Sequence, residues 1–552
     1  MEMTATRRIE PYIHFWNQSE DAGNLVSALE SVAIVKLLGR PAGTAVLQMV
    51  PSRGKHQTTS RANSGDYWQN LFSPMDMVSI GFNDEPPKFV GFVDSPGFSH
   101  MYSSDKPQRN NQISFSDLGK LFTHDNILLL PFFQTWLNGG GPFGDSARII
   151  DEVTGGTHPL LHPIMQRGPL GGISFNFTTV GEAAEFVLEN WPSQQVRTRY
   201  KSSSIEAING LFETKISYRG QPGSNDLWVD AVTDASGLNT YTGNFWNLLR
   251  TIADSEQFYE VFTDIYDGVP HVVVRPTPFD RDGTEGVPAD TLGADAITGG
   301  DGDPNLNIKP GDPFAWERLR KVTLGEEDVI KLDIQRTDDD AFSIYSVGNP
   351  YDLEANLAFT RADLSFAFVD PFALFRFGAR PFIPNSQLLR IAKTQDELAR
   401  LQNLPESEQQ KKRTREEQDV KDFLRTKVGY NQTPNYHSAP SVYQKLIAFR
   451  DRAFNWYHYN PIFMRGTITT RMLLGHKEVK IGERLWCPWL EAQDGSTGVE
   501  FYVTGVIDHW VFGQSSRPGI TTLIVQRGAS ASMRKVYDRK RNEYLNKMRA
   551  GV

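Results

Sequence analysis

Two histidines at helical spacing are the first residues in this chain whose types suggest chemistry. His158 and His162 are four residues apart in the run HPLLHP, a spacing that would place two metal ligands on one face of a helix. A proline follows each histidine, however, and the residue before a proline is disfavoured from the helical conformation. No glutamate follows His158, as the zinc-protease pattern requires. We therefore expect no metal site at these histidines.

An acidic loop further along has part of a calcium-binding pattern. Oxygen-bearing residues fill positions one, three, five and twelve of this loop: Asp301, Asp303, Asn305 and Asp312. Leu306 stands where a calcium loop needs glycine, and aspartate replaces the usual bidentate glutamate at position twelve. A polar exposed loop explains the residues better than a calcium site does, and we expect no cofactor.

Motifs for nucleophilic catalysis or phosphate binding are absent from the sequence. It has neither a Gly-x-Ser-x-Gly turn nor a Gly-x-x-x-x-Gly-Lys-Ser/Thr loop. A glycosidase needs two carboxylates about 5 to 10 Å apart, and 66 acidic residues leave such a pair open. Asp264 and Asp267 flank a predicted hairpin turn, where aspartate favours turn formation. Cys487, the single cysteine, stands between tryptophans and is predicted to be buried and inert. The sequence predicts no catalytic, cofactor-binding or metal-binding residue.

Length and composition favour a large β-rich protein. The chain has 552 residues, of which 46 are glycine and 32 proline, a level typical of turn-rich β architecture. The net charge of −9 argues against a general nucleic-acid-binding protein. The N-terminus lacks the apolar core of a signal peptide, and no run of about 18 apolar residues predicts a membrane-spanning segment. With one cysteine no disulfide can form within the chain, so we expect assembly in a cytoplasm.

The stretch from Asn244 to Asp280 predicts a helix followed by a hairpin. Phe245, Leu248, Leu249 and Ile252 recur at helical spacing. Two β-rich runs, at 258–263 and 271–275, then flank Asp267-Gly268, which is typical of a hairpin turn. Pro276 and Pro278 end the second strand because proline cannot donate to the ladder.

A strand pattern near the N-terminus recurs near the C-terminus. Strands at 78–81 and 89–94 match strands at 479–482 and 502–508, with a glycine ending the first and another inside the second of each pair. A glycine inside a strand indicates a bulge or tight bend, as small barrels need at their corners. Further strand-like runs flank each pair: 44–50 and 112–115, and 467–474 and 521–525. We interpret the two sets as copies of one small β-barrel.

The helix–hairpin–RPTPF unit and the repeated strand pattern resemble the tail or baseplate hub proteins of tailed bacteriophages, and the related hub part of type VI secretion spikes. The resemblance implies a homotrimer that encloses a channel, with two similar barrels per chain. It also implies contacts with tail tube, tape-measure and distal spike proteins, and passage of DNA without specific binding. The location implied is the tail or baseplate of a virion assembled in the host cytoplasm.

The predicted fold class is β-rich α+β, with two similar small β-barrels flanking a mixed α/β middle region and a helical arm. We expect an early helix at Asp21 to Leu38 and further strands at 329–335, 343–347 and 370–380. The charged stretch 395–426 predicts a solvated helical arm, followed by a helix at 442–456. The predicted divisions are a first barrel (1–127), a Gly/Pro-rich insertion with return strands (128–243), a mixed hub domain (244–394), the arm (395–460), a second barrel (461–530) and a basic helical tail (531–552).

The tail from Met533 to Met548 is the most distinctive segment outside the barrels. It is strongly basic, and Met533, Tyr537, Tyr544 and Met548 share one helical face. A basic amphipathic helix can bind a partner, so we expect this tail to point towards neighbouring proteins and away from the core. The function predicted is a non-enzymatic tail hub. The alternatives are a tail-tip enzyme that degrades host cell wall or surface polysaccharide, and the hub of a secretion-type contractile particle.

Overall fold

A computed structural model describes part of the chain, and all structural statements below concern that part. The described ranges are 9–16, 21–24, 29–49, 72–101, 108–124, 126–128, 165–167, 173–175, 218–219, 242–244, 246–247, 249–250, 259–266, 268–276, 319–345, 368–382, 453–454, 456–492, 495–512 and 519–550. The histidine pair at 158 and 162, the acidic loop at 301–312 and the charged arm at 395–426 lie outside these ranges. The domain divisions stay predictions.

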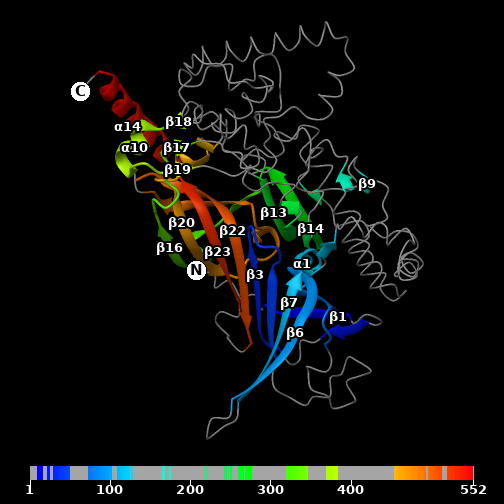
Figure 1. Ribbon diagram of the computed structural model, residues 1–552. Coiled ribbons are helices and arrows are strands. Elements are labelled where there is room, and N and C mark those ends of the chain that lie inside the picture. Colours follow the sequence, from blue (N-terminus) through cyan, green and yellow to red (C-terminus); the bar gives the residue numbers. More distant parts are fainter. Residues whose placement is uncertain are drawn as a thin grey trace, which may run out of the picture.

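A sheet of 13 strands dominates the described residues (Figure 1). Its order is β16-β20-β23-β22-β3-β4-β7-β6-β5-β1-β2, with β21 and β15 attached beside β22. The strands of its N-terminal part are β1 (Pro11–Trp16), β2 (Asp21–Asn24), β3 (Leu29–Leu37), β4 (Thr44–Met49), β5 (Met77–Phe82), β6 (Phe89–Met101) and β7 (Gln108–Asp117). Those of its C-terminal part are β15 (Lys321–Thr323), β16 (Val329–Gln335), β20 (Met464–Arg471), β21 (Arg484–Glu491), β22 (Thr497–Val511) and β23 (Gly519–Ala529).

Smaller elements surround this sheet. Short sheets are formed by β8 (Asn126–Leu128) with β12 (Thr242–Asn244), by β9 (Met165–Arg167) with β10 (Ile173–Phe175), by β11 (Tyr218–Arg219) with β13 (Tyr259–Tyr266) and β14 (Val269–Pro276), and by β17 (Ile344–Tyr345) with β18 (Phe368–Val369) and β19 (Pro381–Phe382). The helices are α1 (Gly119–His124), η10 (Glu326–Asp328), α10 (Pro371–Phe377), η11 (Gly475–Lys477) and α14 (Ala531–Arg549). No described helix has the length and apolar character needed to cross a membrane.

The large sheet consists of two equivalent halves. We call β3 to β7 the N-half, and β16 with β20 to β23 the C-half. The N-half has the order β3-β4-β7-β6-β5, and the C-half has the same order, β16-β20-β23-β22-β21, with every pair antiparallel. The predicted repeat of one β unit is thus present in the described strands.

Irregularities in the strands recur at equivalent places in both halves. β3 shifts register between Leu29 and Ser31, and its counterpart β16 shifts between Val329 and Lys331. The long strand of each half also carries a bulge, between Val93 and Ser95 in β6 and at the equivalent place, between Val503 and Gly505, in β22. Bulges bend a strand and increase its twist, so shared bulges indicate that both halves curve in the same way.

A turn of the same form precedes both β5 and β21. Its position shows that the predicted alignment of the N-terminal and C-terminal strand pairs is out of register. Met75 in the N-half and Gly482 in the C-half both have positive φ, 73° and 76°. Each donates its N–H to the long strand, Met75 to Val93 O at 3.0 Å and Gly482 to Val503 O at 2.8 Å. Residues 479–482 therefore form the turn before β21, and the true counterpart of residues 78–81 begins at Leu485. The sequence match was six residues out of register because both segments share the pattern of alternating apolar residues that ends in glycine.

The two halves join edge to edge within the chain. The second part of β22 pairs with β3 from Gly505↔Leu37 to Val511↔Ser31, and Figure 1 shows the blue β3 beside β22. Each half packs against its own buried cluster, one including Phe89 and Phe115, the other Phe501 and Leu523. The described strands form one continuous sheet and do not close into a barrel in either half, so the two predicted barrels are not confirmed.

Two predicted elements are wrong. The helix expected at Asp21 to Leu38 is replaced by β2 and β3, because residues 29–37 alternate between buried and partly exposed positions and include β-branched side chains. The strand expected at 370–380 is instead helix α10. Asp370 accepts a hydrogen bond from the Phe372 N–H, a proline follows at the first turn, and Gly378 ends the helix with φ of 80°, which are all helix signals.

Several other predictions are confirmed. β13 and β14 form the expected hairpin, with Tyr266 opposite Val269 around Asp267-Gly268. In the preceding segment Trp246 and Leu249 are helical and buried, and the Asn244 side chain accepts a hydrogen bond from the Asn247 N–H at 2.9 Å. β16 has the bounds expected for residues 329–335.

The C-terminal helix packs differently from the expectation. Met533, Tyr537 and Arg541 of α14 are buried, with exposed fractions of 5%, 4% and 3%. The Arg541 Nε lies 3.6 Å from Asp370 Oδ1, so the helix is anchored to α10 by a buried ion pair. The first part of the tail therefore packs on its own chain, because its basic residue at 541 finds a carboxylate that compensates its burial. The later part of the helix faces outward, with Met548 at 52% exposed.

Candidate functional site: the polar junction of the two sheet halves

The hairpin β13–β14 lies where the two sheet halves meet, and its polar residues are buried. Glu260, Thr263 and Asp264 have exposed fractions of only 8%, 5% and 3%. Buried polar groups are costly unless they are hydrogen-bonded. Their partners lie in both halves of the sheet, so the hairpin ties the halves together.

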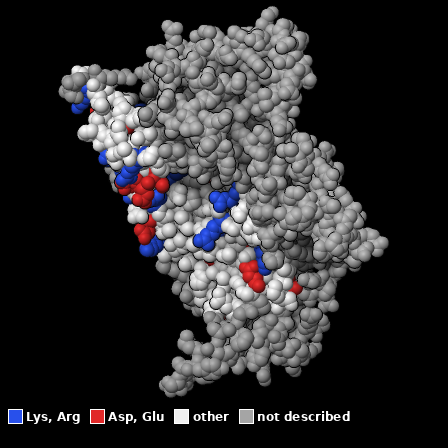
Figure 2. Space-filling model, in the orientation of Figure 1, with Lys and Arg blue, Asp and Glu red and all other residues white. Residues whose placement is uncertain are grey.

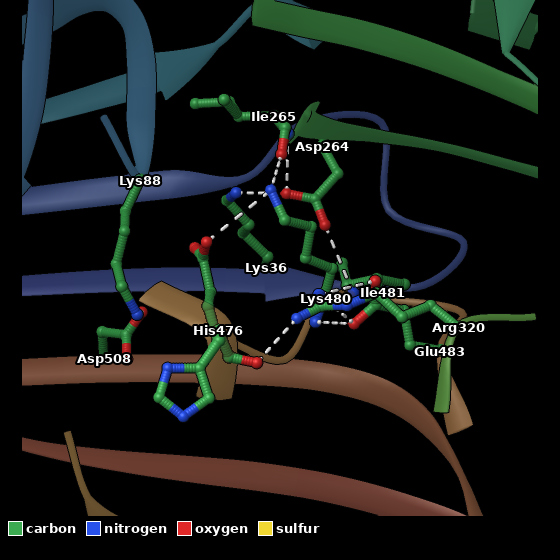
Figure 3. Close-up of polar contacts among 11 residues, drawn as sticks. Lys36, Lys88, Asp264, Ile265, Arg320, His476, Lys480, Ile481, Glu483 and Asp508 are labelled. Atoms are coloured by element: carbon green, nitrogen blue, oxygen red, sulfur yellow. Dashed lines mark hydrogen bonds and ion pairs between the residues drawn. The ribbon is translucent and has the colours of Figure 1, made fainter. Parts of the chain in front are cut away.

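Asp264 is the centre of this junction (Figure 3). It forms an ion pair with Lys36 of β3, which is buried in the N-half. Its other carboxylate oxygen accepts the N–H of Ile481 in the turn before β21, at 3.2 Å. The nearby Lys480 ammonium donates to the Ile265 carbonyl. The Asp264 carboxylate therefore links its own hairpin to β3 of the N-half and to the turn before β21 of the C-half. Its role is larger than the turn formation predicted for it.

Burial and the neighbouring charges shift the pKa values of Lys36 and Asp264 in opposite directions. Burial alone would raise the pKa of Asp264, but Lys36 and Lys480 outweigh it and hold that pKa below its ordinary value. Burial would lower the pKa of Lys36, but Asp264 outweighs it and the pKa is raised. Both groups are therefore charged across the neutral range.

A second buried ion pair crosses the same boundary. Lys88, which immediately precedes β6, lies 2.9 Å from Asp508 of β22, and the two side chains are 7% and 5% exposed. The Thr521 hydroxyl of β23 donates to the other oxygen of Asp508. This pair links the N-half to the C-half directly, without the hairpin.

The hairpin is also bonded to each half separately. The Thr263 hydroxyl donates to Asp117 of β7 at 2.7 Å, and Asp117 also accepts the N–H groups of Gly43 and Gly119. On the other side the Tyr502 hydroxyl of β22 lies 2.7 and 2.6 Å from the two oxygens of Glu260. Burial raises the pKa of Asp117 to about 6, although its three hydrogen bonds act to lower it.

The pH dependence of stability follows from these shifts. Because the Asp264 pKa is lowered and the Lys36 pKa is raised, their pair stabilises the fold fully between about pH 4 and about pH 10, the ordinary values of the two groups. Its contribution is lost below and above that window. Asp117 acts in the opposite sense, because a raised carboxyl pKa favours folding as the proton binds, from about pH 6 down to its ordinary value of 3.8.

We therefore expect Asp117→Asn to remove one component of the pH dependence. The displacement of the Asp117 pKa corresponds to a stabilisation of about 3 kcal/mol that develops between about pH 6 and pH 4. Urea unfolding of the wild type and the variant, repeated at every half pH unit over this range, gives the free energy of unfolding at each pH. The component appears as a difference between the two proteins in the slope of this free energy against pH. Equal slopes in the two proteins would contradict the assignment to Asp117.

The sequence-predicted candidates for chemistry are not brought together in the described residues. Cys487 is fully buried in the C-half core, and burial raises the pKa of its thiol to about 12, so its predicted inertness has a physical cause. The described residues hold no cluster of three or more histidine, cysteine or acidic residues that could bind a metal. The ion pairs Lys36–Asp264 and Lys88–Asp508 of the junction were missed because no local sequence pattern joins residues so far apart.

Acidic and basic groups also alternate on the described surface. Arg465 pairs with Asp339 and Asp340, and Arg380 pairs with Asp338 at 2.8 Å. Figure 2 shows such oppositely charged side chains next to each other along one margin of the molecule. Pairs of this kind cancel the extended positive field that nucleic-acid binding needs.

Comparisons with known proteins give similarity to several solved structures, two of which are described here. No protein-family model matches the chain, and no curated protein matches it. The tail protein from Neisseria meningitidis MC58 is similar over 94% of this chain and 96% of its own, with 12% identity and a TM-score of 0.39. The 43 kDa tail protein of prophage MuSo2 from Shewanella oneidensis is similar over 94% of this chain and 98% of its own, with 10% identity and a TM-score of 0.38. Both are tail proteins, the class of virion protein that the sequence pattern resembles.

Proposed function

We propose that this chain is a structural, non-enzymatic protein of a phage tail, the hub that joins the tail tube to the distal tip around a channel for DNA. The observation that carries the proposal is the duplication of one β unit within a single chain. The two copies share strand order and bulges and are joined edge to edge by β22 and β3. An enzyme does not require such a duplication, whereas three chains that together present six similar units do.

Symmetry gives the duplication a physical purpose. Three chains with two equivalent units each supply six similar units around one axis. Such a ring can meet a sixfold tube on one side and a threefold tip on the other, because closed rings must present matching surfaces around their axis. We therefore propose a homotrimer located in the tail or baseplate, where it contacts tail tube, tape-measure and distal spike proteins.

The junction supports a mechanical role. Its buried carboxylates are each engaged by a lysine, a hydroxyl or backbone N–H groups. Separating a buried ion pair leaves an uncompensated charge inside the protein, which penalises other arrangements of the two halves. A hub has to hold the angle between its two units while other proteins attach to it, and a polar junction that permits one arrangement suits this task.

The outward part of α14 is a candidate contact for a tail partner. Phe375 of α10 is 77% exposed and Met548 of α14 is 52% exposed, and Phe375 lies 5.3 Å from the ring of Tyr544. Exposed apolar side chains that gather in one place mark interaction sites. Basic residues of α14 accompany them, so an acidic surface of a neighbouring tail protein fits this end of the helix.

The test is the mass of the assembly together with its place in a particle. Light scattering on the purified protein should give three times the chain mass of 62.2 kDa, and electron microscopy should show a ring. Particles that carry a labelled copy should show the label at the tail tip. A monomer in solution, together with particles that lack the label or carry it along the shaft or on the capsid, would refute the proposal. Turnover of purified peptidoglycan or capsule would refute the non-enzymatic part alone.

A further inference from the structure

Exposed apolar side chains gather where α10 meets the outer end of α14. We call residues 369–377 and 540–548 the helix corner, and Figure 1 shows the two helices beside each other near the C-terminus. Six large apolar side chains are exposed in the described part of the chain, and four of them lie in this corner: Val369, Leu374, Phe375 and Met548. A concentration of this kind marks an interaction site.

The apolar face of α14 continues beyond the part that its own chain covers. Tyr537 is buried, at 4% exposed. Tyr544 lies two turns further along the same face and is half-buried. Its ring centroid lies 5.4 Å from that of Phe372 and 5.3 Å from that of Phe375. Met548, one turn further still, is 52% exposed, and Phe375 is 77% exposed. The end of this face and Phe375 therefore form one apolar surface.

Buried contacts hold the helix corner in place. Asp370, which is 1% exposed, accepts the N–H of Phe372 at 3.1 Å and so caps α10. The same carboxylate lies 3.6 Å from the Arg541 Nε of α14. The rings of Phe372 and Tyr537 also pack edge to face, with centroids 5.6 Å apart. A surface that is already ordered loses less conformational entropy when a partner binds.

Positive charge lies beside this apolar surface. Residues 531–549 include seven basic and two acidic residues, a net charge of +5 in a chain whose net charge is −9. Lys540 and Lys547 are exposed and flank the apolar face of α14 on one side, and Arg376 is exposed in the last turn of α10. Glu543 lies 4.0 Å from Arg539, which compensates its charge. Because complementary charges attract and orient a partner, the corner fits an acidic surface.

We propose that the helix corner binds an acidic amphipathic helix of a neighbouring tail protein. The apolar face of that helix covers Phe375, Tyr544 and Met548, and its carboxylates lie beside Lys540 and Lys547. A helix suits a surface that is itself made by two helices, because its residues at i, i+3, i+4 and i+7 form one apolar face. The inference rests on the tail function proposed above and adds the chemistry of one partner.

Two other occupants fit the corner less well. A helix that lies on a lipid surface has an apolar face along its whole length, but Met533 and Tyr537 on that face of α14 are buried against their own chain. The last two turns alone remain for a membrane. A second copy of this chain would bring the same positive charge to the contact, and like charges repel each other.

Binding of a designed peptide, followed by fluorescence anisotropy, tests the surface. The probe is a labelled peptide of about 20 residues with leucine at i, i+3, i+4 and i+7 and with glutamate and alanine elsewhere. The full chain should bind it at least about tenfold more tightly than the same peptide with lysine in place of glutamate. Salt raised from about 0.05 M to about 0.5 M should weaken binding, because it screens exposed charges.

A matched pair of phenylalanine variants tests the apolar part. Phe375→Ala should weaken binding of the acidic peptide by about tenfold or more, since aromatic anchors carry much of the affinity of an interface. Phe512→Ala is the control. Phe512 follows β22, lies outside the helix corner and is 72% exposed, so its loss should leave binding unchanged.

A matched pair of charge reversals tests the electrostatic part. Lys540→Glu with Lys547→Glu should weaken binding by about tenfold. Lys535→Glu with Arg539→Glu changes the net charge by the same amount on the opposite face of α14, where both side chains are exposed. This control should change binding by less than about twofold. Circular dichroism should match the wild type in all four variants.

The outcomes separate this inference from the proposed function. Weaker binding in Phe375→Ala and in the Lys540–Lys547 variant, with binding kept in both controls, supports the helix corner. Equal affinity for the acidic and basic peptides, or equal losses in the controls, overturns it and leaves the tail function standing. Tighter binding to vesicles of phosphatidylcholine and phosphatidylserine than to the peptide also overturns it, in favour of a lipid surface. Selective peptide binding by a protein that is absent from tail particles would overturn the tail function and leave the chemistry of the corner.

Discussion

Replacing Lys36 with methionine is expected to lower the free energy of unfolding by about 3 kcal/mol, the lower end of the range for breaking a buried pair. Methionine fills much of the volume of lysine but leaves the Asp264 carboxylate without its ammonium partner in a buried site. The N–H groups of Ile481 and Ile265 still bond to Asp264, which limits the loss. Denaturant unfolding at pH 7 measures the change.

Two further variants test whether the loss of stability in Lys36→Met arises because the remaining charge is buried. Lys36→Met combined with Asp264→Leu removes both charges and should recover much of the loss, because an apolar pair of similar volume is often tolerated in place of a buried ion pair. Lys331→Met breaks the exposed pair with Asp333, whose nitrogen–oxygen separation is 3.8 Å, and should change the free energy by less than about 1 kcal/mol. A larger loss for Lys331→Met than for Lys36→Met would contradict this account of the junction.

Deleting residues 533–552 is expected to destabilise the C-half and make the protein prone to aggregation. The deletion removes the buried side chains of Met533 and Tyr537, each worth about 1.5 to 3 kcal/mol of burial. It also removes Arg541, leaving the buried Asp370 without its ion-pair partner. Thermal unfolding and the soluble yield should both fall. This differs from the expectation from the sequence that the tail points away from the core.

A shorter deletion separates folding from partner binding. Removing residues 545–552 keeps Tyr544 and the buried side chains of α14, and removes only partly or fully exposed side chains among those described. It should change the free energy of unfolding, measured by thermal unfolding, by less than about 0.5 kcal/mol, as surface changes usually do. It should weaken attachment to a tail neighbour, measured as the fraction of protein recovered in particles. Equal loss of stability in the two deletions would show that the outer part of α14 also belongs to the fold.

Local patterns of the sequence were sufficient for several elements. The hairpin around Asp267-Gly268 was predictable because turn residues and flanking β-branched runs act over a few positions. The repeat of one β unit was also visible, since both copies keep apolar residues at alternate positions. The register of the repeat was not, because a pattern of period two matches itself after a shift and only hydrogen bonds fix the true partner.

The sequence by itself determined that this protein is β-rich, contains two related units and carries a hairpin between them, because these properties depend on residue types within a few positions of one another. The tertiary structure alone decided how the units are joined. Lys36 and Asp264 are 228 positions apart, and Lys88 and Asp508 are 420 apart, so no local pattern marks them as partners. Their pairing, the joining of β3 to β22 and the burial of the basic helix α14 all follow from which surfaces meet when the chain folds, and burial then requires each charge to find its opposite.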